Sequence, residues 1–220
     1  MRVVVTGATD GIGAAVVALY RARDADVIGT GRRRDATLPD GATYVQADQN
    51  EPAAAAEAVA LAVRGRGWEA VDRVVLNAGT GRVGEPWDDP TIRETVEVNL
   101  VATVLLAHAL APFVLEAGGV LTLVGSRATT APRFAAYAAT KAGLAGLARS
   151  LGEEWRGRAH VQCVSPGATR TAMHDKAGLR VGRARALFAA PDAVARAIVR
   201  AQDARAPSHR LNPVRLALPW

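Results

Sequence analysis

Val3-Val4-Val5-Thr6-Gly7-Ala8-Thr9-Asp10-Gly11-Ile12-Gly13 opens the chain, and this stretch decides the fold class. Its β-branched start predicts a buried strand. Its glycines predict a tight turn, and the alanine- and valine-rich residues that follow, to about Arg23, predict a helix. This order is typical of a phosphate-binding turn, because glycines let the backbone approach a phosphate and the helix start presents free N–H groups. An ordinary turn whose glycines serve packing is the alternative.

The same alternation continues along the chain. Apolar strand-like runs separate helix-like stretches, which predicts a parallel sheet covered by helices on both faces. We therefore predict an α/β fold, a Rossmann-type doubly wound parallel sheet, in a single domain over residues 1–220. The predicted strands are 2–6, 26–30, 42–47, 71–76, 119–124 and 160–164, with a weak one near 214–218, and the predicted helices are 12–23, 51–63, 91–116, 136–155 and 191–203.

Tyr137 and Lys141 stand four residues apart in a predicted helix, so their side chains share one face. A free phenol, with a pKa of about 10, transfers protons poorly near neutral pH. An ammonium group beside it favours the phenolate and lowers that pKa, which makes the pair a candidate acid/base device. Lys141 and Lys176 are the lysines of a chain whose 27 basic residues are otherwise arginine, so a compact point charge is expected to matter here.

Six motifs, in order, make the chain resemble the short-chain dehydrogenase/reductase family over about residues 1–175. Each motif alone is weak, whereas the ordered set is specific. The resemblance implies an enzyme that interconverts a carbonyl and an alcohol by hydride transfer with a nicotinamide dinucleotide. The motifs are met by Thr6, Gly7, Gly11 and Gly13; by Asn77-Ala78-Gly79; by Asn99; by Ser126; by Tyr137 and Lys141; and by Pro166-Gly167 with Thr171.

By this resemblance, four residues carry the chemistry. Tyr137 transfers the proton to or from the substrate oxygen. Lys141 lowers the phenol pKa and holds the nicotinamide ribose. Ser126 polarises the carbonyl, and Asn99 supports a water chain to solvent.

Two of these assignments have alternatives. Ser126 precedes Tyr137 by eleven residues, slightly fewer than is usual in the family, so a role shared with Thr129 or Thr130 is the alternative. An asparagine inside a helix can also simply bond a neighbouring backbone carbonyl, which is the alternative for Asn99.

The end of the second predicted strand bears on the coenzyme. There, Gly31-Arg32-Arg33-Arg34 carries no carboxylate to bind the ribose of NAD, whereas arginine suits the extra phosphate of NADP. We therefore predict NADP, bound mainly through Arg32 with help from Arg33. Asp10 argues the other way, because NADP-preferring relatives often carry a base at that position. Asp48 matches the family's adenine-contacting Asp, with an N-cap of helix 51–63 as the alternative.

The resemblance extends these contacts to a full coenzyme site. Substrate contacts are expected from a lid over about 168–190, where Arg170 and three further arginines suit a carboxylate, phosphate or acyl-carrier substrate unless they are merely solvated. The predicted coenzyme-binding residues are Gly7, Thr9, Gly11, Ile12, Gly13, Arg32, Arg33, Asp48, Asn77, Gly79, Tyr137, Lys141, Pro166, Gly167 and Thr171.

Charge, cysteine content and motifs limit the kinds of partner that we expect for this protein. The net charge is +6 and the pI about 10.4, but the arginines are scattered and no zinc finger or basic helix accompanies them, so we expect no nucleic-acid partner. Cys163 is the single cysteine, which excludes an internal disulfide and fits a reducing compartment. We find no motif for a metal.

Location and assembly follow from similar considerations. No signal peptide is evident, and the apolar stretch from Leu100 to Leu115 is shorter than the ~20 residues that span a bilayer, so we expect a cytoplasmic protein without a membrane partner. A homodimer through helices 91–116 and 136–155 is expected. Rival functions are a non-catalytic nucleotide-sensing or scaffold protein, and an isomerase or dehydratase that uses the same tyrosine.

Overall fold

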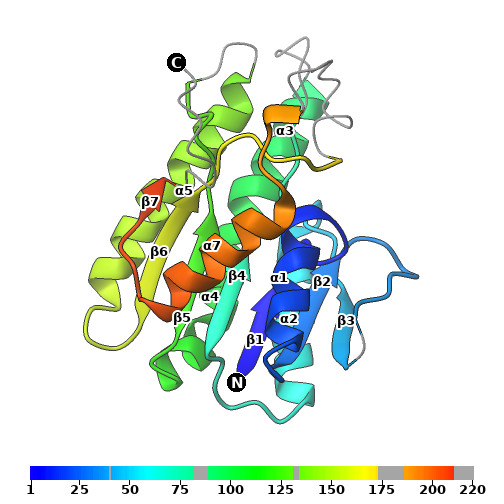
Figure 1. Cartoon of the computed structure of the whole chain (residues 1–220), viewed down its shortest axis with the longest axis vertical. Helices are drawn as coiled ribbons and strands as arrows, with labels where there is room; N and C mark the ends of the chain where they lie inside the picture. The colour runs from blue at the N-terminus through cyan, green and yellow to red at the C-terminus, as the bar shows by residue number, and fades with distance from the viewer. Residues whose placement is uncertain (40, 82–88, 131–133, 173–185, 211–220) are drawn as a thin grey trace.

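The computed structural model describes residues 1–39, 41–81, 89–130, 134–172 and 186–210. Its strands form one parallel sheet in the order β3-β2-β1-β4-β5-β6-β7 (Figure 1). The chain winds outward from β1 in one direction and then, from β4, in the other, so the topological switch point, where a ligand crevice is expected in such sheets, lies between the carboxyl ends of these two strands. The strands are β1 (Arg2–Val5), β2 (Asp26–Gly31), β3 (Ala42–Gln46), β4 (Arg73–Leu76), β5 (Val120–Val124), β6 (His160–Ser165) and β7 (His209–Arg210).

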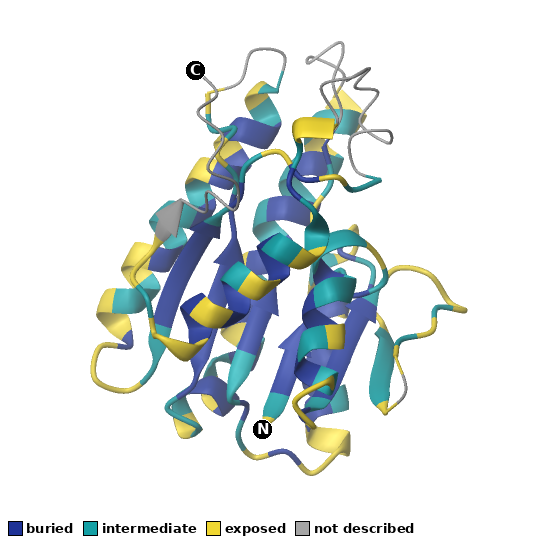
Figure 2. Cartoon of the chain, viewed as in Figure 1, coloured by how far each residue is buried: buried dark blue, intermediate teal, exposed yellow. Residues whose placement is uncertain are grey.

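Helices cover both faces of the sheet, because successive strand residues point to opposite sides. Val4 of β1 packs in the core cluster of helices α2 (Pro52–Gly65), α4 (Ala102–Glu116) and α5 (Ala135–Glu154). Its neighbours Val3 and Val5 pack in the other cluster, with α1 (Gly11–Arg21) and α7 (Pro191–Asp203). The central strands are therefore buried on both sides, while the edge strand β3 is only partly covered (Figure 2).

The predicted α/β fold with a doubly wound parallel sheet is confirmed, with differences at element ends. Strand β4 begins at Arg73, two residues later than predicted, and β7 was not predicted. A two-residue strand leaves too little hydrophobic alternation to be recognised in the sequence. The weak strand predicted near 214–218 lies outside the described residues.

The predicted helix 91–116 is a composite. It consists of α3 (Asp89–Val96), a π-helical turn η1 (Glu97–Val101) and α4. Together they form one run, Asp89–Glu116, long and apolar enough to cross a membrane by length and composition. The expectation that this apolar stretch is too short was therefore wrong for the whole run. Half of its most apolar window is buried, because α4 packs on α2 and the sheet.

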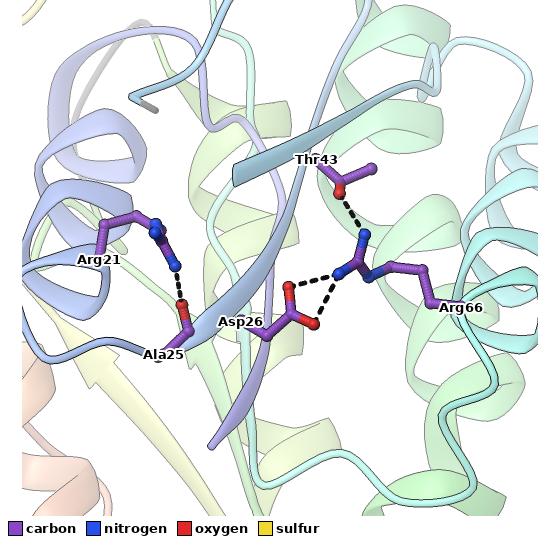
Figure 3. Close-up of polar contacts among 5 residues, drawn as sticks. All are labelled: Arg21, Ala25, Asp26, Thr43 and Arg66. Carbon is purple, nitrogen blue, oxygen red and sulfur yellow. Dashed lines mark hydrogen bonds and ion pairs between the residues drawn. The ribbon is translucent and has the colours of Figure 1, made fainter. Parts of the chain in front are cut away.

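At the amino ends of the strands, arginines tie neighbouring elements together (Figure 3). Arg66, just after α2, donates to both carboxylate oxygens of Asp26 on β2, at 2.8 and 2.6 Å, and to the Thr43 hydroxyl on β3 at 2.8 Å. Arg21 of α1 donates to the Ala25 carbonyl at 2.5 Å. These contacts fix the end of the sheet opposite the crevice.

Candidate active site

The glycine turn between β1 and α1 lies at the carboxyl edge of the sheet. Gly7 and Gly11 adopt positive φ angles of 64° and 54°, which favour glycine. A Cβ on Gly13 would lie 2.1 Å from the Gly7 carbonyl oxygen, so this glycine lets the helix pack against its own turn. A Cβ on Gly11 would meet the Thr171 methyl group at 2.9 Å, which brings the predicted Thr171 to the same turn. Ile12 packs beneath it against the core.

Asn77, at the end of β4, holds this turn in place. Its side-chain amide donates to the carbonyls of Thr6 and Gly7, at 3.1 and 3.4 Å. In return, the Thr6 hydroxyl accepts from the backbone N–H groups of Asn77 and Ala78, at 3.0 and 3.1 Å. The segment after β4 and the glycine turn therefore form one rigid floor for the crevice.

Asn99 lies in the π turn η1 and is fully buried. Its carboxamide oxygen accepts from the Thr80 N–H at 2.7 Å, and its amide donates to the Thr80 carbonyl at 2.8 Å. The amide also reaches the Thr140 hydroxyl at 3.2 Å, which in turn donates to the Tyr137 carbonyl at 2.8 Å. π turns often mark functional sites. Asn99 thus links the loop after β4 to the helix that carries Tyr137 and Lys141.

Tyr137 and Lys141 do share one face of α5, as the spacing predicted, and both are buried. The Lys141 ammonium lies 5.8 Å from the centre of the Tyr137 ring and donates to the Val124 carbonyl at 3.0 Å. The Ser126 hydroxyl lies close enough to the Tyr137 phenol to act on its pKa, and it accepts from the Ala128 N–H at 3.0 Å. Of the three candidate hydroxyls after β5, the structure therefore brings Ser126 to the phenol.

The expected lowering of the Tyr137 pKa by Lys141 is not found. Burial raises the pKa of the phenol above its usual 10, and the neighbouring Ser126 hydroxyl opposes this only in part. Desolvation of a buried phenolate outweighs an ammonium that lies beside the ring rather than at the oxygen. The phenol is therefore protonated at neutral pH and is poised as a proton donor.

The environment acts on Lys141 in the opposite sense. Burial lowers its pKa to about 8, and the nearby Cys163 thiol group opposes the shift. Glycines line the walls around both side chains. A Cβ on Gly79 would lie 3.0 Å from the Asn99 carboxamide oxygen and 3.3 Å from the Lys141 ammonium, and one on Gly81 would lie 2.9 Å from the Tyr137 ring.

At the carboxyl end of β2, neighbouring side chains crowd the space that a side chain at position 31 would occupy. A Cβ there would lie 2.9 Å from the Thr9 methyl group and 3.1 Å from the Tyr44 hydroxyl, so a side chain at this position would have to displace those groups. Arg33 reaches toward the glycine turn, with its guanidinium 3.4 Å from the Thr9 carbonyl. The side chain of Arg32 is exposed. Asp10 accepts from the Gly11 N–H at 2.7 Å and caps α1.

Asp48 does not cap helix α2. Glu51 occupies the position before the helix, and Asp48 instead accepts from the backbone and side-chain amides of Asn50, each at 3.0 Å. The next residue, Gln49, is 6% exposed, and neither its side-chain nitrogen nor its oxygen has a partner among the described residues. The sequence analysis missed Gln49. In the sequence it is only a polar residue between a predicted strand and a predicted helix, which does not mark a binding residue.

The segment after β6 closes the site. Buried Pro166 accepts from the Arg127 N–H at 3.0 Å, and Gly167 follows it. Thr169 pairs with Ala189, so the two ends of the predicted lid 168–190 lie together, while residues 173–185 lie outside the described part. Thr140, which binds Asn99, was also missed, although its place between Tyr137 and Lys141 was a signal.

These residues fit a dinucleotide. A close-approach glycine turn at a helix start suits a pyrophosphate, and a buried amide without a partner at the same edge suits a ligand that supplies one. The turn, Arg33, Asn77 and Lys141 would hold the coenzyme. Within the described residues, no group of three His, Cys, Asp or Glu side chains is arranged to hold a metal ion.

Comparisons with known proteins agree with this geometry. The sequence profile of the family described as short chain dehydrogenase matches residues 1–181. D-threitol dehydrogenase from Mycolicibacterium smegmatis is 33% identical, with 89% of this chain and 83% of the relative covered. 1-deoxy-11-beta-hydroxypentalenate dehydrogenase from Streptomyces arenae is 37% identical, with coverages of 77% and 67%.

Solved structures give the same answer. A short-chain dehydrogenase from Sphingobium yanoikuyae in complex with NADPH is 27% identical with a TM-score of 0.80, and the match covers 98% of this chain and 89% of that one. A 3-ketoacyl-(acyl-carrier-protein) reductase from Brucella melitensis complexed with NADH, at 23% identity, 95% and 94% coverage and a TM-score of 0.83, shares the fold. The chain belongs to the short-chain dehydrogenase/reductase family, as an NAD(P)-dependent oxidoreductase.

Proposed function

We propose that the protein is an NADP-dependent carbonyl reductase or alcohol dehydrogenase in which Tyr137 is the acid/base. One observation carries this proposal: the buried Tyr137 phenol lies next to the Ser126 hydroxyl and beside the buried Lys141 ammonium. All three lie where parallel strands end, which is where ligands bind in such sheets.

Proton transfer follows from the geometry. In the reductive direction, a substrate carbonyl oxygen accepts hydrogen bonds from Tyr137 and Ser126, and the phenol proton passes to that oxygen as the alcohol forms. The bound nicotinamide supplies the hydride. Because burial raises the phenol pKa, the proton needed for reduction is present at neutral pH. Oxidation needs the phenolate and is therefore expected to accelerate as the pH rises.

Two further residues support this step. The Lys141 ammonium, held at the Val124 carbonyl, places a positive charge beside the phenol and stabilises the phenolate that is left after proton transfer. Asn99 fixes the Thr80 backbone next to both side chains through two hydrogen bonds. The Asn99 backbone carbonyl accepts from the Thr103 hydroxyl at 2.9 Å. The expected water chain from Asn99 to solvent stays a prediction.

The preference for NADP rests on the end of β2. Gly31 supplies no ribose-binding carboxylate, and Arg33 holds a guanidinium near Thr9 of the glycine turn. A guanidinium binds a phosphate through parallel charge-assisted hydrogen bonds. We therefore assign the main phosphate contact to Arg33 in place of Arg32, and Asp10 moderates the preference by its negative charge.

The names of the relatives denote chemically different substrates, so they do not identify the substrate of this protein. The names D-threitol dehydrogenase and 1-deoxy-11-beta-hydroxypentalenate dehydrogenase denote an uncharged polyol and a carboxylate as substrates of those proteins. For this chain we propose a small molecule that carries a carbonyl or secondary alcohol. A cytoplasmic location, a homodimer and a lid over 168–190 remain parts of the proposal.

A coenzyme-consumption screen tests the function. Purified protein is given NADPH or NADH with a panel of ketones, aldehydes and acyl thioesters, and loss of reduced nicotinamide is followed by absorbance. We expect turnover with a higher kcat/KM for NADPH, and reduced discrimination in Arg33→Ala. Coenzyme binding without turnover across the panel points to a sensor or scaffold, and product formation without net coenzyme oxidation points to an isomerase or dehydratase.

A further inference from the structure

Two side chains of the edge strand β3 hold the loop that carries Arg33. The Tyr44 hydroxyl donates to the Arg33 carbonyl at 2.6 Å, and the Gln46 side-chain amide donates to the Arg32 carbonyl at 3.2 Å. Tyr44 and Gln46 stand two residues apart on β3, so both point to the same face of the sheet. Val45 between them packs with the α2 cluster on the other face. One face of β3 therefore anchors two consecutive carbonyls of the loop after β2.

These anchors matter because the loop itself is exposed. Residues 32–35 are all exposed, so packing contributes little to holding them in place. An exposed arginine loses side-chain freedom when it binds a phosphate, and a mobile backbone beneath it would add to that entropic cost. A backbone that is already held at its carbonyls lowers the cost before the ligand arrives.

Arg33 is held at two points of its length. Tyr44 accepts no share of the guanidinium and instead binds the backbone carbonyl, while the guanidinium lies 3.4 Å from the Thr9 carbonyl of the glycine turn. Burial raises the pKa of the Tyr44 phenol, and the Arg33 charge opposes this shift, so the hydroxyl stays protonated at neutral pH and remains a donor. The backbone and the charged end of Arg33 are thus fixed by different elements, β3 and the glycine turn.

We propose that Tyr44 and Gln46 are positioning residues for coenzyme selection, because they fix the loop on which Arg33 meets the extra phosphate of NADP. This inference deepens the NADP preference proposed above and rests on it. Neither side chain needs to touch the coenzyme. Without the anchors, the protein keeps its affinity for the dinucleotide that both coenzymes share and loses part of its selectivity for the phosphate.

Calorimetric titration of NADP⁺ and NAD⁺ into the purified protein tests this without any substrate. The two coenzymes differ by one phosphate, so the ratio of their Kd values isolates the phosphate contact. Tyr44→Phe removes only the anchoring hydroxyl and should weaken NADP⁺ binding about 3- to 10-fold while NAD⁺ binding changes little. Gln46→Met should have a smaller effect of the same sign, because its hydrogen bond is longer and its side chain is exposed.

A second comparison separates positioning from direct contact with the phosphate. In Arg33→Ala no guanidinium remains to be positioned, so adding Tyr44→Phe should change the ratio of the two Kd values little further. Losses that add in the double variant would show that the Tyr44 hydroxyl acts independently of Arg33, and this would overturn the proposal. Tyr20→Phe is the matched control, because its hydroxyl donates to Gln202 at 2.6 Å, and it should leave both Kd values unchanged.

The outcomes also distinguish this inference from the proposed function. An unchanged ratio in Tyr44→Phe, or equal weakening of both coenzymes, overturns the positioning role while the NADP preference of the wild type stands. A wild-type protein that binds NAD⁺ as tightly as NADP⁺ removes the proposed preference, and this inference falls with it. A selective loss of NADP⁺ affinity in Tyr44→Phe that disappears in the Arg33→Ala background supports both.

Discussion

The two ends of the sheet are built on opposite principles. At the amino ends of the strands, arginines meet carboxylates and carbonyls, as the exposed Arg66 does with Asp26 and the half-buried Arg21 with Ala25 (Figure 3). At the carboxyl ends, polar groups are buried with few partners, as in Lys141 and Gln49. The amino end uses its polar groups to hold elements together. The carboxyl end does the same through Asn77 and Asn99, but it also keeps Lys141 and Gln49 desolvated and available to a ligand.

This contrast explains why the site carries the shifted pKa values. Burial lowers the pKa of Lys141 to about 8 and raises that of Tyr137 because neither has a full counter-charge. An uncompensated buried group costs stability, which the rest of the fold must offset. Changes at the carboxyl end are therefore expected to alter activity strongly, and changes at the amino end to alter only stability, and weakly.

The largest effect is expected from Tyr137→Phe. Without the hydroxyl, no proton passes to the substrate oxygen, so kcat should fall about 10²- to 10⁴-fold with NADPH binding retained. Steady-state rates and coenzyme titration by fluorescence check this. Tyr20→Phe is the matched control, because its hydroxyl donates to Gln202 at 2.6 Å away from the site. That control should lose stability and keep its kcat, and near-normal turnover in Tyr137→Phe would contradict the mechanism.

Next in size is the pH dependence of stability contributed by Lys141. Its folded pKa of about 8 lies below the ordinary value of 10.5, so between these values the unfolded chain binds more protons. Stability should therefore rise with pH across this window, since protonation of the buried amine is the costly state. From pH ~7.5 to ~9.5, the gain should be on the order of 1–2 kcal/mol. Lys141→Met should lack it.

Urea denaturation of both proteins at each pH gives this difference directly. Subtracting the Lys141→Met curve removes the contributions of other titrating groups, including the tyrosines. A wild-type protein whose stability falls relative to the variant over this range would show that the amine is paired in the folded state. The charged groups at the carboxyl end would then be paired, as they are at the amino end.

The sequence predicted which residues lie at the carboxyl end of the sheet better than it predicted the pKa shifts of those residues. Glycine turns, Asn77 and the Tyr137–Lys141 pair were recognisable because each depends on local spacing within one turn or one helix. The predicted direction of the Tyr137 pKa shift was wrong, because the shift depends on burial of the phenol by segments distant in sequence. The same holds for the π turn at Asn99, which depends on contacts with Thr80 and Thr140.

The amino end was not visible in the sequence at all. Arg66 and Asp26 are forty residues apart, and the chain has many other arginines and carboxylates. Only the parallel pairing of β2 with β3, and the packing of α2 beside them, brings the two together. Short-range patterns therefore predict where chemistry occurs, while long-range ion pairs require the fold.

A smaller effect is expected from Gln49→Met. Replacing a buried amide that has no partner by an apolar side chain of similar shape should stabilise the coenzyme-free protein by about 1 kcal/mol. The same change should weaken NADPH binding if the amide meets the coenzyme. Gln202→Met is the matched control, because the buried Gln202 amide donates to the Val74 carbonyl at 3.2 Å and accepts from the Tyr20 hydroxyl at 2.6 Å, and its loss should not stabilise. Destabilisation by Gln49→Met would show that the amide is already satisfied.

The smallest effect is expected at the amino end, from the pair Arg66 and Asp26. Their side chains are 37% and 38% exposed, so water screens the attraction and the coupling energy should not exceed about 1 kcal/mol. Arg66→Ala should cost more than Asp26→Ala, because Arg66 also lies 5.4 Å over the Trp68 ring. A double-mutant cycle by urea denaturation isolates the pair from these other contacts. Activity should be unchanged in all three variants, and a loss of kcat would mean that the two ends of the sheet are energetically coupled.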